Sequence, residues 1–127
     1  MDTSFSKSKT IKGKPPSLPF EMMKNKILGK KYELSLVFIG DHLSKKLNNK
    51  YRNKNTSTNI LSFPIENDSG EIFINLNQSK KDASCFKKSY NDFVRLLFIH
   101  GCLHLVGYKH GKKMEIEEIK MYKELVH

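Results

Sequence analysis

The spacing of apolar residues along the chain predicts an alternation of helices and short strands. Apolar positions that recur at helical spacing predict helices, and compact or alternating apolar runs between turn residues predict strands. The predicted helices cover residues 20–28, 41–51, 78–86, 90–106 and 112–126. The predicted strands cover residues 33–39, 59–63 and 71–76, the last two as a hairpin around turn residues 66–70. This order corresponds to a small α/β or α+β layer with one mixed sheet.

Two single residues predict where a helix begins and where a strand ends. Asp41 is expected to cap the second helix, with Leu43 and Leu47 facing inward. Pro64 cannot donate to a strand ladder. The strand before it is therefore expected to end there or to lie at a sheet edge.

The composition indicates one globular domain. At 127 residues, with 38% hydrophobic and 28% charged residues, the chain is long enough to bury an ordinary core. Residues 1–17 are rich in serine, lysine and proline and predict a loose basic tail, so residues 18–127 are expected to form the single domain. No apolar run suits a membrane span or a signal peptide, which favours a cytoplasmic protein with no membrane partner. Cys85 and Cys102 are too few for a thiolate metal site, and both are expected to be buried and reduced.

The net charge of +10, from 23 Lys and Arg against 13 Asp and Glu, favours a polyanionic partner. Nucleic acid and an anionic membrane surface both fit such a charge. Lysine pairs such as Lys45-Lys46 fit an ordinary solvated surface equally well. Charge alone therefore does not choose between these interpretations.

Three of the five histidines lie within eleven residues, in the segment HGCLHLVGYKH. His100 and His104 are four residues apart on a long predicted helix, so both imidazoles lie on the same side. Gly107 permits the left-handed turn that ends the helix and brings His110 back as a third ligand. Three protein ligands and an open fourth position are typical of a catalytic zinc site that binds water. Cys102 points to the opposite side of the helix and belongs to the core.

The same histidine spacing occurs in metzincin proteases, where a glutamate after the first histidine serves as general base. Here that residue is Gly101, so a peptidase of this type would lack its base. Zinc coordination by itself can bring the pKa of a bound water to about 7. A zinc-bound hydroxide therefore remains available as the nucleophile.

A polar, basic segment, residues 48–64, leads into the second predicted strand, and loops at strand ends often carry binding groups. Arg52 can present two parallel N–H donors to a phosphate, a geometry that lysine cannot match. A solvated arginine fits the sequence equally well. Ser62 alternates with apolar neighbours and is expected to face away from the core. The further candidates for lining a cleft are Thr58, Ser62 and Glu71.

Together the histidine segment and the basic segment resemble the YbeY family of bacterial single-strand-specific endoribonucleases. The resemblance rests on HGCLHLVGYKH at residues 100–110, on LNNKYRNKN…TNILSFP at 47–64 and on GEIFIN at 70–75. It extends over residues 18–127 and leaves the tail outside. The histidine motif is specific, because its Gly101 differs from the protease pattern.

The resemblance implies a zinc ion held by His100, His104 and His110, at a helix-turn, and an essential arginine at Arg52. It implies an α+β fold with a mixed sheet of about four strands packed with helices. It also implies a role in maturing ribosomal RNA, notably the 3′ end of the small-subunit RNA, and in ribosome quality control. The basic charge then has RNA as its expected partner.

Three features depart from the family pattern. Lys109 stands where the family usually has Asp before the third histidine, and an ammonium group cannot accept a hydrogen bond. Lys109 could instead meet a phosphate. The connection from His110 to the last helix is several residues shorter than usual. Asn59 stands where many members have Asp, so no base role is assigned to it.

The sequence therefore supports the hypothesis of a zinc-dependent endoribonuclease in which Arg52 neutralises charge on the phosphoryl oxygens. The residues predicted to bind substrate are Lys54, Thr58, Ser62 and Lys109. Single-stranded ribosomal RNA is the expected partner, with ribosomal proteins as further candidates. Two alternatives stay open: an RNA-binding ribosome-assembly factor with a structural zinc, and a metal-dependent hydrolase of another substrate such as a peptide.

Overall fold

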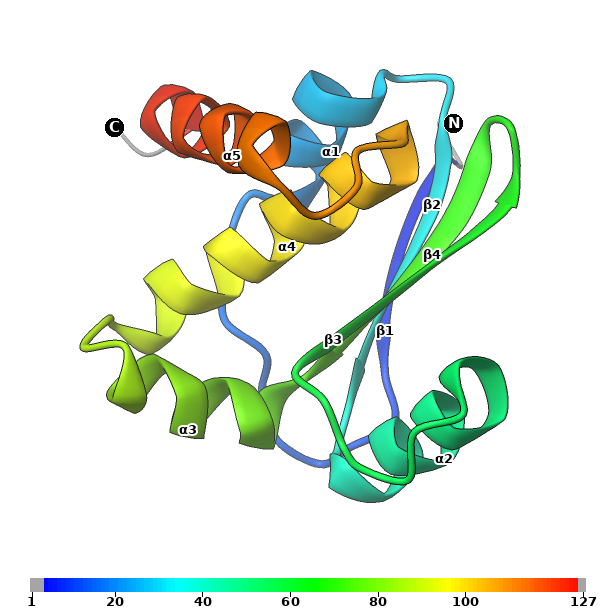
Figure 1. The fold of residues 1–127 in the computed structure, drawn as a ribbon, viewed down its shortest axis with the longest axis vertical. Coiled ribbons are helices and arrows are strands. Elements are labelled where there is room, and N and C mark those ends of the chain that lie inside the picture. The colour runs from blue at the N-terminus through cyan, green and yellow to red at the C-terminus, as the bar shows by residue number, and fades with distance from the viewer. Residues whose placement is uncertain (1–3, 126–127) are drawn as a thin grey trace.

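A four-stranded mixed sheet organises the computed structural model, which describes residues 4–125 (Figure 1). The strands are β1 (Phe5–Lys9), β2 (Glu33–Ile39), β3 (Ile60–Glu66) and β4 (Ser69–Asn75). The helices are α1 (Phe20–Leu28), α2 (Asp41–Arg52), α3 (Leu76–Cys85), α4 (Tyr90–Val106) and α5 (Lys112–Leu125). The predicted α+β class and the mixed sheet of four strands are confirmed. Val126, the predicted last residue of the final helix, lies outside the described residues.

The strand order is β1-β2-β4-β3, with β2 parallel to both neighbours and β3 antiparallel to β4. Alternate residues of the two central strands are buried, namely Leu34, Leu36, Phe38, Ile72 and Ile74. Phe20 of α1 joins this core, with ring centroids 5.6 Å from Phe38 and 5.1 Å from Phe98 of α4. One face of the sheet is thus covered by α1 and α4, and α5 packs on α4 (Figure 1).

β1 is the strand that the apolar pattern does not predict. The expectation of a loose tail over residues 1–17 is wrong for Phe5–Lys9, which pair in parallel with β2. Phe5 packs against the core, and the following four residues are exposed. Backbone hydrogen bonds to β2 continue beyond both ends of β1: the Leu34 N–H donates to the Ser4 carbonyl at 2.8 Å, and the Thr10 N–H donates to the Phe38 carbonyl at 3.0 Å. Backbone pairing needs no apolar side chains, so this strand has no hydrophobic signature.

α2 buries polar rather than apolar side chains. Leu43 and Leu47 are half-buried, whereas Ser44 and Asn48 are at most 2% exposed. The Ser44 hydroxyl accepts from the Thr58 N–H at 2.9 Å and donates to the Thr58 carbonyl at 2.8 Å. Asn48 donates its side-chain amide to the carbonyl of the same loop at residue 56, at 2.9 Å. The inner side of α2 faces a loop whose backbone groups need partners, which explains the polar residues.

The expected cap of α2 is also corrected. Gly40 is the N-cap residue and Asp41 is the first residue of the helix. The Asp41 carboxylate accepts hydrogen bonds from the side-chain amides of Asn75 and Asn77. These bonds, that of Asn75 first, hold the pKa of Asp41 below its usual value. Asp41 therefore ties α2 to the junction of β4 and α3.

Pro64 lies inside β3, which is an edge strand of the described sheet. The outer side of an edge strand needs no ladder donor, so proline is tolerated there. The pairing with β4 shifts between Pro64 and Glu66. The predicted edge position is confirmed, although the strand continues beyond the predicted residue 63.

The two cysteines differ in their surroundings. Cys102 is fully buried in the core, as expected, and burial raises the pKa of its thiol. Cys85 is exposed, so the expectation that it is buried is wrong. Cys85 is the last residue of α3, whose buried residues lie on the opposite side of the helix.

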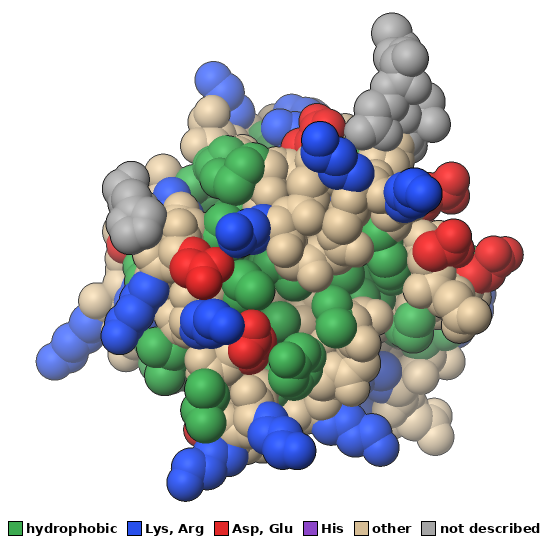
Figure 2. All heavy atoms as spheres, turned by 90° about the horizontal axis from the view of Figure 1, so that it is seen from above, with side chains coloured by type: hydrophobic (Ala, Val, Ile, Leu, Met, Phe, Trp, Pro, Cys, Tyr) green, Lys and Arg blue, Asp and Glu red, His purple; other side chains and the backbone are tan. Residues whose placement is uncertain are grey.

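Figure 2 shows the face of the molecule that α1 and α5 form, seen from above. Basic and acidic side chains are scattered over this face around apolar ones. The exposed apolar residues of these two helices include Met22, Ile116 and Ile119. The excess of positive charge is therefore not gathered into one patch on this face. Among residues 4–125, no helix has the length and apolar character needed to cross a membrane.

Candidate metal centre

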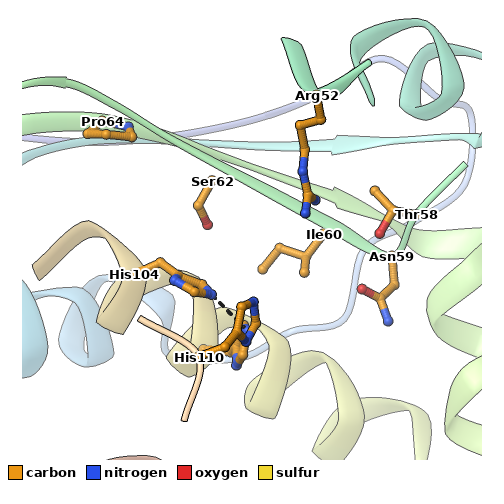
Figure 3. A pocket seen from close by; sticks show the side chains of 9 residues that line it. Arg52, Thr58, Asn59, Ile60, Ser62, Pro64, His104 and His110 are labelled. Carbon is orange, nitrogen blue, oxygen red and sulfur yellow. Dashed lines mark hydrogen bonds between the residues drawn. The ribbon is translucent and has the colours of Figure 1, made fainter. Parts of the chain in front are cut away.

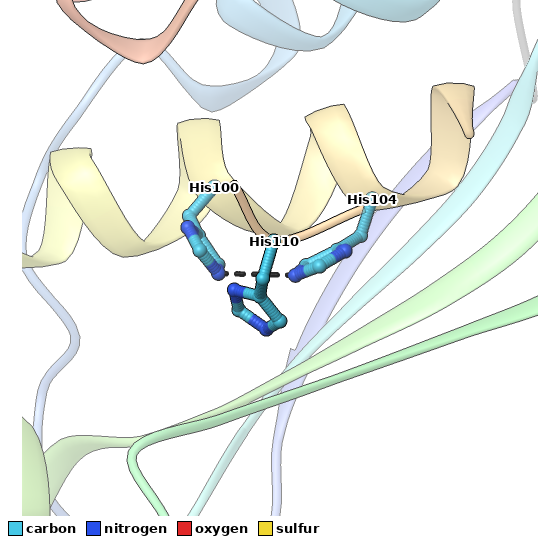
Figure 4. A group of neighbouring side chains, drawn as sticks. All are labelled: His100, His104 and His110. Carbon is cyan, nitrogen blue, oxygen red and sulfur yellow. Dashed lines mark hydrogen bonds between the residues drawn. The ribbon is translucent and has the colours of Figure 1, made fainter. Parts of the chain in front are cut away.

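α4 carries two of the predicted metal ligands, and local signals define both of its ends. At the start, the Ser89 hydroxyl accepts a hydrogen bond of 3.1 Å from the Asp92 N–H. At the end, Gly107 adopts a left-handed conformation with φ of 117° and donates its N–H to the His104 carbonyl at 3.0 Å. The chain then turns back, and this turn brings His110 beside the two histidines of α4 (Figure 4).

The three histidine rings meet at one point. The ring centroid of His104 lies 4.6 Å from that of His100 and 4.5 Å from that of His110, and the third separation is 5.2 Å. One nitrogen of each ring lies within 4.8 Å of the other two. His100 and His104 are half-buried, whereas His110 is exposed. Three convergent imidazole nitrogens open to solvent on one side could hold a metal ion and still admit a further ligand.

The outer nitrogens of two of the rings are already engaged. His104 Nδ1 donates to the Tyr108 carbonyl at 3.0 Å, and His100 Nδ1 contacts the Glu118 carboxylate. Protons on both Nδ1 atoms leave the two Nε2 lone pairs facing each other across 3.1 Å. A cation bound by both nitrogens would relieve that repulsion. The donor set therefore fits a metal ion such as zinc.

Burial lowers the pKa of His104, and the neighbouring His100 and His110 lower it further. The hydrogen bond to the Tyr108 carbonyl and the charge of Glu118 act in the opposite direction. The neutral imidazole is the form that binds a metal ion. Desolvation therefore favours the form of His104 that can act as a ligand.

Glu118 is absent from the residues predicted from the sequence. It lies on α5, one helical turn after the buried Met114, and its side chain is 25% exposed. The i, i+4 spacing from Met114 is the one signal that would place it on the inner face of α5. A carboxylate that accepts from a ligand histidine orients the ring and fixes its tautomer. Glu118 is therefore a positioning residue for His100.

Replacing Glu118 by glutamine is expected to weaken zinc binding by about 10- to 100-fold, the usual effect of losing such a partner. The amide fills the same volume but lacks the negative charge that favours the protonated Nδ1 of His100. Competition with a chromophoric chelator measures the zinc affinity. Glu117→Gln, on the neighbouring position of α5, is the matched control and should bind zinc like the wild type. Equal affinities of the two variants would contradict this role.

The histidines open onto a cleft of about 540 Å³ between α4 and β3 (Figure 3). Arg52, the last residue of α2, points its guanidinium into this cleft from the opposite wall. The other lining residues on that wall are Thr58, Asn59, Ile60, Ser62 and Pro64. The structure thus brings the three histidines, Arg52, Thr58 and Ser62 together around one cavity. A guanidinium and two hydroxyls beside a metal centre suit a phosphodiester, since its oxygens accept hydrogen bonds from all three.

Two lysines predicted to bind substrate lie outside the cleft lining. Lys54 is exposed in the loop after α2, next to Asn53, which adopts a left-handed conformation with φ of 59°. Lys109 is exposed beside His110 and borders a neighbouring hollow formed by residues 107–113. Their roles stay predictions, as contacts to RNA that continues beyond the cleft.

Glu71 does not line the cleft, so its expected place there is wrong. Side chains alternate along a strand, and Glu71 pairs with Phe63 on the face of the sheet that points away from α4. It borders a different hollow. Ser62 pairs with the buried Ile72 on the face of the sheet that α4 covers, so the expectation that it faces away from the core is wrong. It lines the cleft. Asn59 also lines the cleft and donates its side-chain amide to the Asp82 carboxylate at 2.9 Å.

Gly101 allows α4 to approach β3 closely. A Cβ atom at this position would lie 2.9 Å from both Ile60 Cδ1 and Ser62 Oγ, and 3.1 Å from Ile72 Cδ1. Any side chain here would require Ile60, Ser62 and Ile72 to shift, or α4 to move away from the strand. The position that carries the catalytic glutamate in metzincins is therefore crowded even for a Cβ atom here.

A family model described as endoribonuclease YbeY matches residues 14–126. The chain belongs to the YbeY family. The resemblance drawn from the two sequence motifs is thereby confirmed, and the family supports a metal-dependent endoribonuclease.

Individual YbeY relatives are similar over most of this chain. An endoribonuclease YbeY of Nautilia profundicola is 39% identical over 100 residues, which are 73% of this chain and 72% of the relative. One from Pelagibacter ubique is 33% identical over 118 residues, or 87% of this chain and 77% of the relative. One from Karelsulcia muelleri is 38% identical over 86 residues, or 65% and 61% of the two chains. In eight such relatives the match spans 53% to 77% of the relative's own length.

The chain also shares its fold with a solved structure. The solution structure of a Thermotoga maritima protein matches it with a TM-score of 0.67 at 23% sequence identity. The match covers 95% of this chain and 88% of the other. This similarity concerns the fold, and it agrees with the small α+β architecture described above.

Proposed function

We propose that this chain is a zinc-dependent endoribonuclease that cleaves single-stranded RNA. The observation that carries the proposal is the single cleft that Arg52 and the three histidines line. Membership of the YbeY family supports the reaction class. The net charge of +10 supports a polyanionic substrate, since phosphate contacts dominate the affinity of proteins for nucleic acids.

In this proposal each functional group of the cleft has a separate task. His100, His104 and His110 would hold a zinc ion, which would supply Lewis-acid polarisation of a water molecule or of a phosphodiester oxygen. Arg52 donates two parallel N–H groups to the non-bridging oxygens and neutralises the charge that grows on them in the transition state. Thr58 and Ser62 donate hydroxyl hydrogen bonds to the same or a neighbouring nucleotide.

The lysines outside the cleft lining bind the RNA on either side of the cleaved bond. Lys54 and Lys109 hold flanking phosphates through contacts that weaken as salt rises. Lys109 is a cation where the family usually has a carboxylate, so it takes no part in orienting a ligand. Glu118 supplies the carboxylate that contacts a zinc ligand in this chain.

We place this activity in the cytoplasm, in the maturation of ribosomal RNA, notably at the 3′ end of the small-subunit RNA, and in ribosome quality control. The proposal rests on the family resemblance of the two motifs. Its partners are single-stranded and ribosomal RNA, with ribosomal proteins as further candidates. Gly101 disfavours a peptide substrate, because no general-base carboxylate follows the first histidine.

Replacing Arg52 by alanine is expected to lower kcat/KM on single-stranded RNA by about 100- to 1,000-fold, as loss of a transition-state donor usually does. Zinc content should stay that of the wild type. The measurement is cleavage of end-labelled RNA by zinc-loaded proteins purified identically. Lys45→Ala removes an exposed cation from the same helix and serves as the control, with wild-type activity. A chelator should stop the wild type.

Two outcomes would contradict the proposal. If every variant cuts alike and the chelator has no effect, the activity belongs to a contaminating ribonuclease. If the wild type binds RNA and zinc but does not cut, the chain is an assembly factor with a structural zinc.

A further inference from the structure

Three aromatic rings form a connected cluster beside the cleft, one pair tilted and the other edge-to-face. The ring of Tyr51, on α2, lies 5.0 Å from that of Phe63 on β3, and Phe63 lies 6.0 Å from Phe73 on β4. Phe63 and Phe73 are half-buried in the sheet, whereas Tyr51 is 57% exposed. Large aromatic side chains usually bury most of their surface. Tyr51 therefore presents a supported aromatic surface to solvent.

This exposed ring is next to the catalytic groups. Tyr51 precedes Arg52 in α2, and Phe63 lies between Ser62 and Pro64, which both line the cleft. Since successive side chains of a strand point to opposite faces, the Tyr51–Phe63 pair lies behind the cleft wall that β3 forms. An RNA strand that leaves the cleft across β3, the edge strand of the sheet, would next meet the Tyr51 ring.

The charges around Tyr51 suit an anionic polymer on one side only. The Lys50 ammonium lies 5.1 Å from the Tyr51 ring centroid, and Arg52 and Lys54 follow in the chain. On the other side, the cross-strand partner of Phe63 is Glu71, whose carboxylate repels phosphates. The backbone of a bound RNA would therefore pass on the lysine side. The Lys50 ammonium, which lies over the Tyr51 ring, would move to a phosphate as one base takes its place on the ring.

We propose that Tyr51, supported by Phe63, is a stacking platform for one nucleobase that flanks the cleaved phosphodiester of single-stranded RNA. The inference rests on the proposed function and names a binding site beyond the cleft. Stacking on an exposed aromatic ring is the usual way in which proteins hold single-stranded bases, and it tolerates any base because each has a π-face. In duplex RNA the bases are paired and stacked on one another, so the platform favours single strands.

The test compares zinc-loaded wild type with Tyr51→Leu and Tyr51→Phe, using kcat/KM for one single-stranded RNA oligomer. Copies of this oligomer, each with one abasic nucleotide, locate the stacked base. We expect one flanking position at which the abasic copy is cut about tenfold less efficiently by the wild type. Tyr51→Leu keeps an apolar contact with Phe63 but loses the flat ring, so it should cut the intact oligomer about tenfold less efficiently. Tyr51→Phe should retain the wild-type value.

The decisive result is whether the effects of Tyr51→Leu and of removing the stacked base are additive. On the copy that lacks the stacked base, Tyr51→Leu should cause no further loss. Phe86→Leu is the matched control, because Phe86 is 67% exposed and lies at the end of α3, outside the cleft lining. It should cut the whole series like the wild type. Thermal denaturation of each variant separates a loss of stacking from a loss of fold.

Several outcomes would overturn the platform while the proposed function stands. One is a wild type that cuts RNA but shows no sensitive abasic position. Another is a Tyr51→Leu protein that cuts as the wild type does, or that loses equally on intact and abasic RNA. If Tyr51→Leu does not fold, the cleavage of the abasic copies by the wild type and by Tyr51→Phe tests the platform: the absence of a sensitive position would overturn it. A wild type that neither binds nor cuts RNA would overturn the proposed function, and the platform with it.

Discussion

Replacing His104 by alanine is expected to abolish zinc binding and RNA cleavage together while the fold is retained. The His104 ring lies within 4.6 Å of both other histidine rings, centroid to centroid. Without it, His100 and His110 form a two-ligand site, one short of the three that catalytic zinc usually has. The loss of a direct ligand exceeds the 10- to 100-fold effect of an outer partner. Zinc affinity should therefore fall by more than about 100-fold, and cleavage should fall to background.

His42→Ala is the matched control, since His42 is exposed on α2 and outside the cleft lining. Zinc per chain and the melting temperature with and without zinc are the measurements. A ligand that binds only the folded state raises its melting temperature. Zinc should therefore stabilise the wild type and His42→Ala, but not His104→Ala. A His104→Ala protein that still holds one tightly bound zinc ion would contradict the assigned ligand set.

Replacing Gly101 by glutamate is expected to destabilise the folded chain by about 4 kcal/mol or more. A Cβ atom at this position already comes within 2.9 Å of Ile60 Cδ1 and Ser62 Oγ. Gly101 is also buried in α4, so a charged side chain there loses much of its hydration. Proteins are commonly stable by about 5–15 kcal/mol, so this change removes a large part of the total. Urea denaturation measures the loss.

Gly101→Ala should cost about 2 kcal/mol, because the crowding of one methyl group is partly offset by the better helix propensity of alanine. Gly13→Glu is the control, since Gly13 is exposed and its nearest contact for a Cβ atom is an ordinary 3.8 Å. It should change the free energy of unfolding by less than about 0.5 kcal/mol. A Gly101→Glu protein as stable as the wild type would contradict the close approach of α4 to β3.

The convergence of the three histidines could be predicted from the sequence because their geometry is mostly local. The spacing of His100 and His104 places them on one side of any helix, and Gly107 allows the return to His110. The structure shows these three rings together. The strands β2, β3 and β4 could be predicted in the same way, because each is a short apolar run between turn residues.

The remaining features depend on contacts between distant segments. Glu118 reaches His100 only because α5 packs on α4, and neither residue carries that information in its own neighbourhood. The polar inner side of α2 follows from the loop that Ser44 holds, not from a helical repeat of apolar residues. β1 pairs through its backbone, so its composition does not reveal it. The position of Arg52 in the cleft likewise depends on how α2, β3 and α4 pack together, which the sequence near Arg52 does not show.

β1 also shields the edge of the hydrophobic strand β2. After Phe5 its residues are exposed and include two lysines, the kind of edge that discourages pairing with another chain. A truncated chain that begins after Lys9 would expose the unpaired backbone of β2, next to the buried Leu34 and Leu36. Such an edge is prone to aggregation. An expression tag at the N-terminus should therefore leave Phe5–Lys9 free to pair.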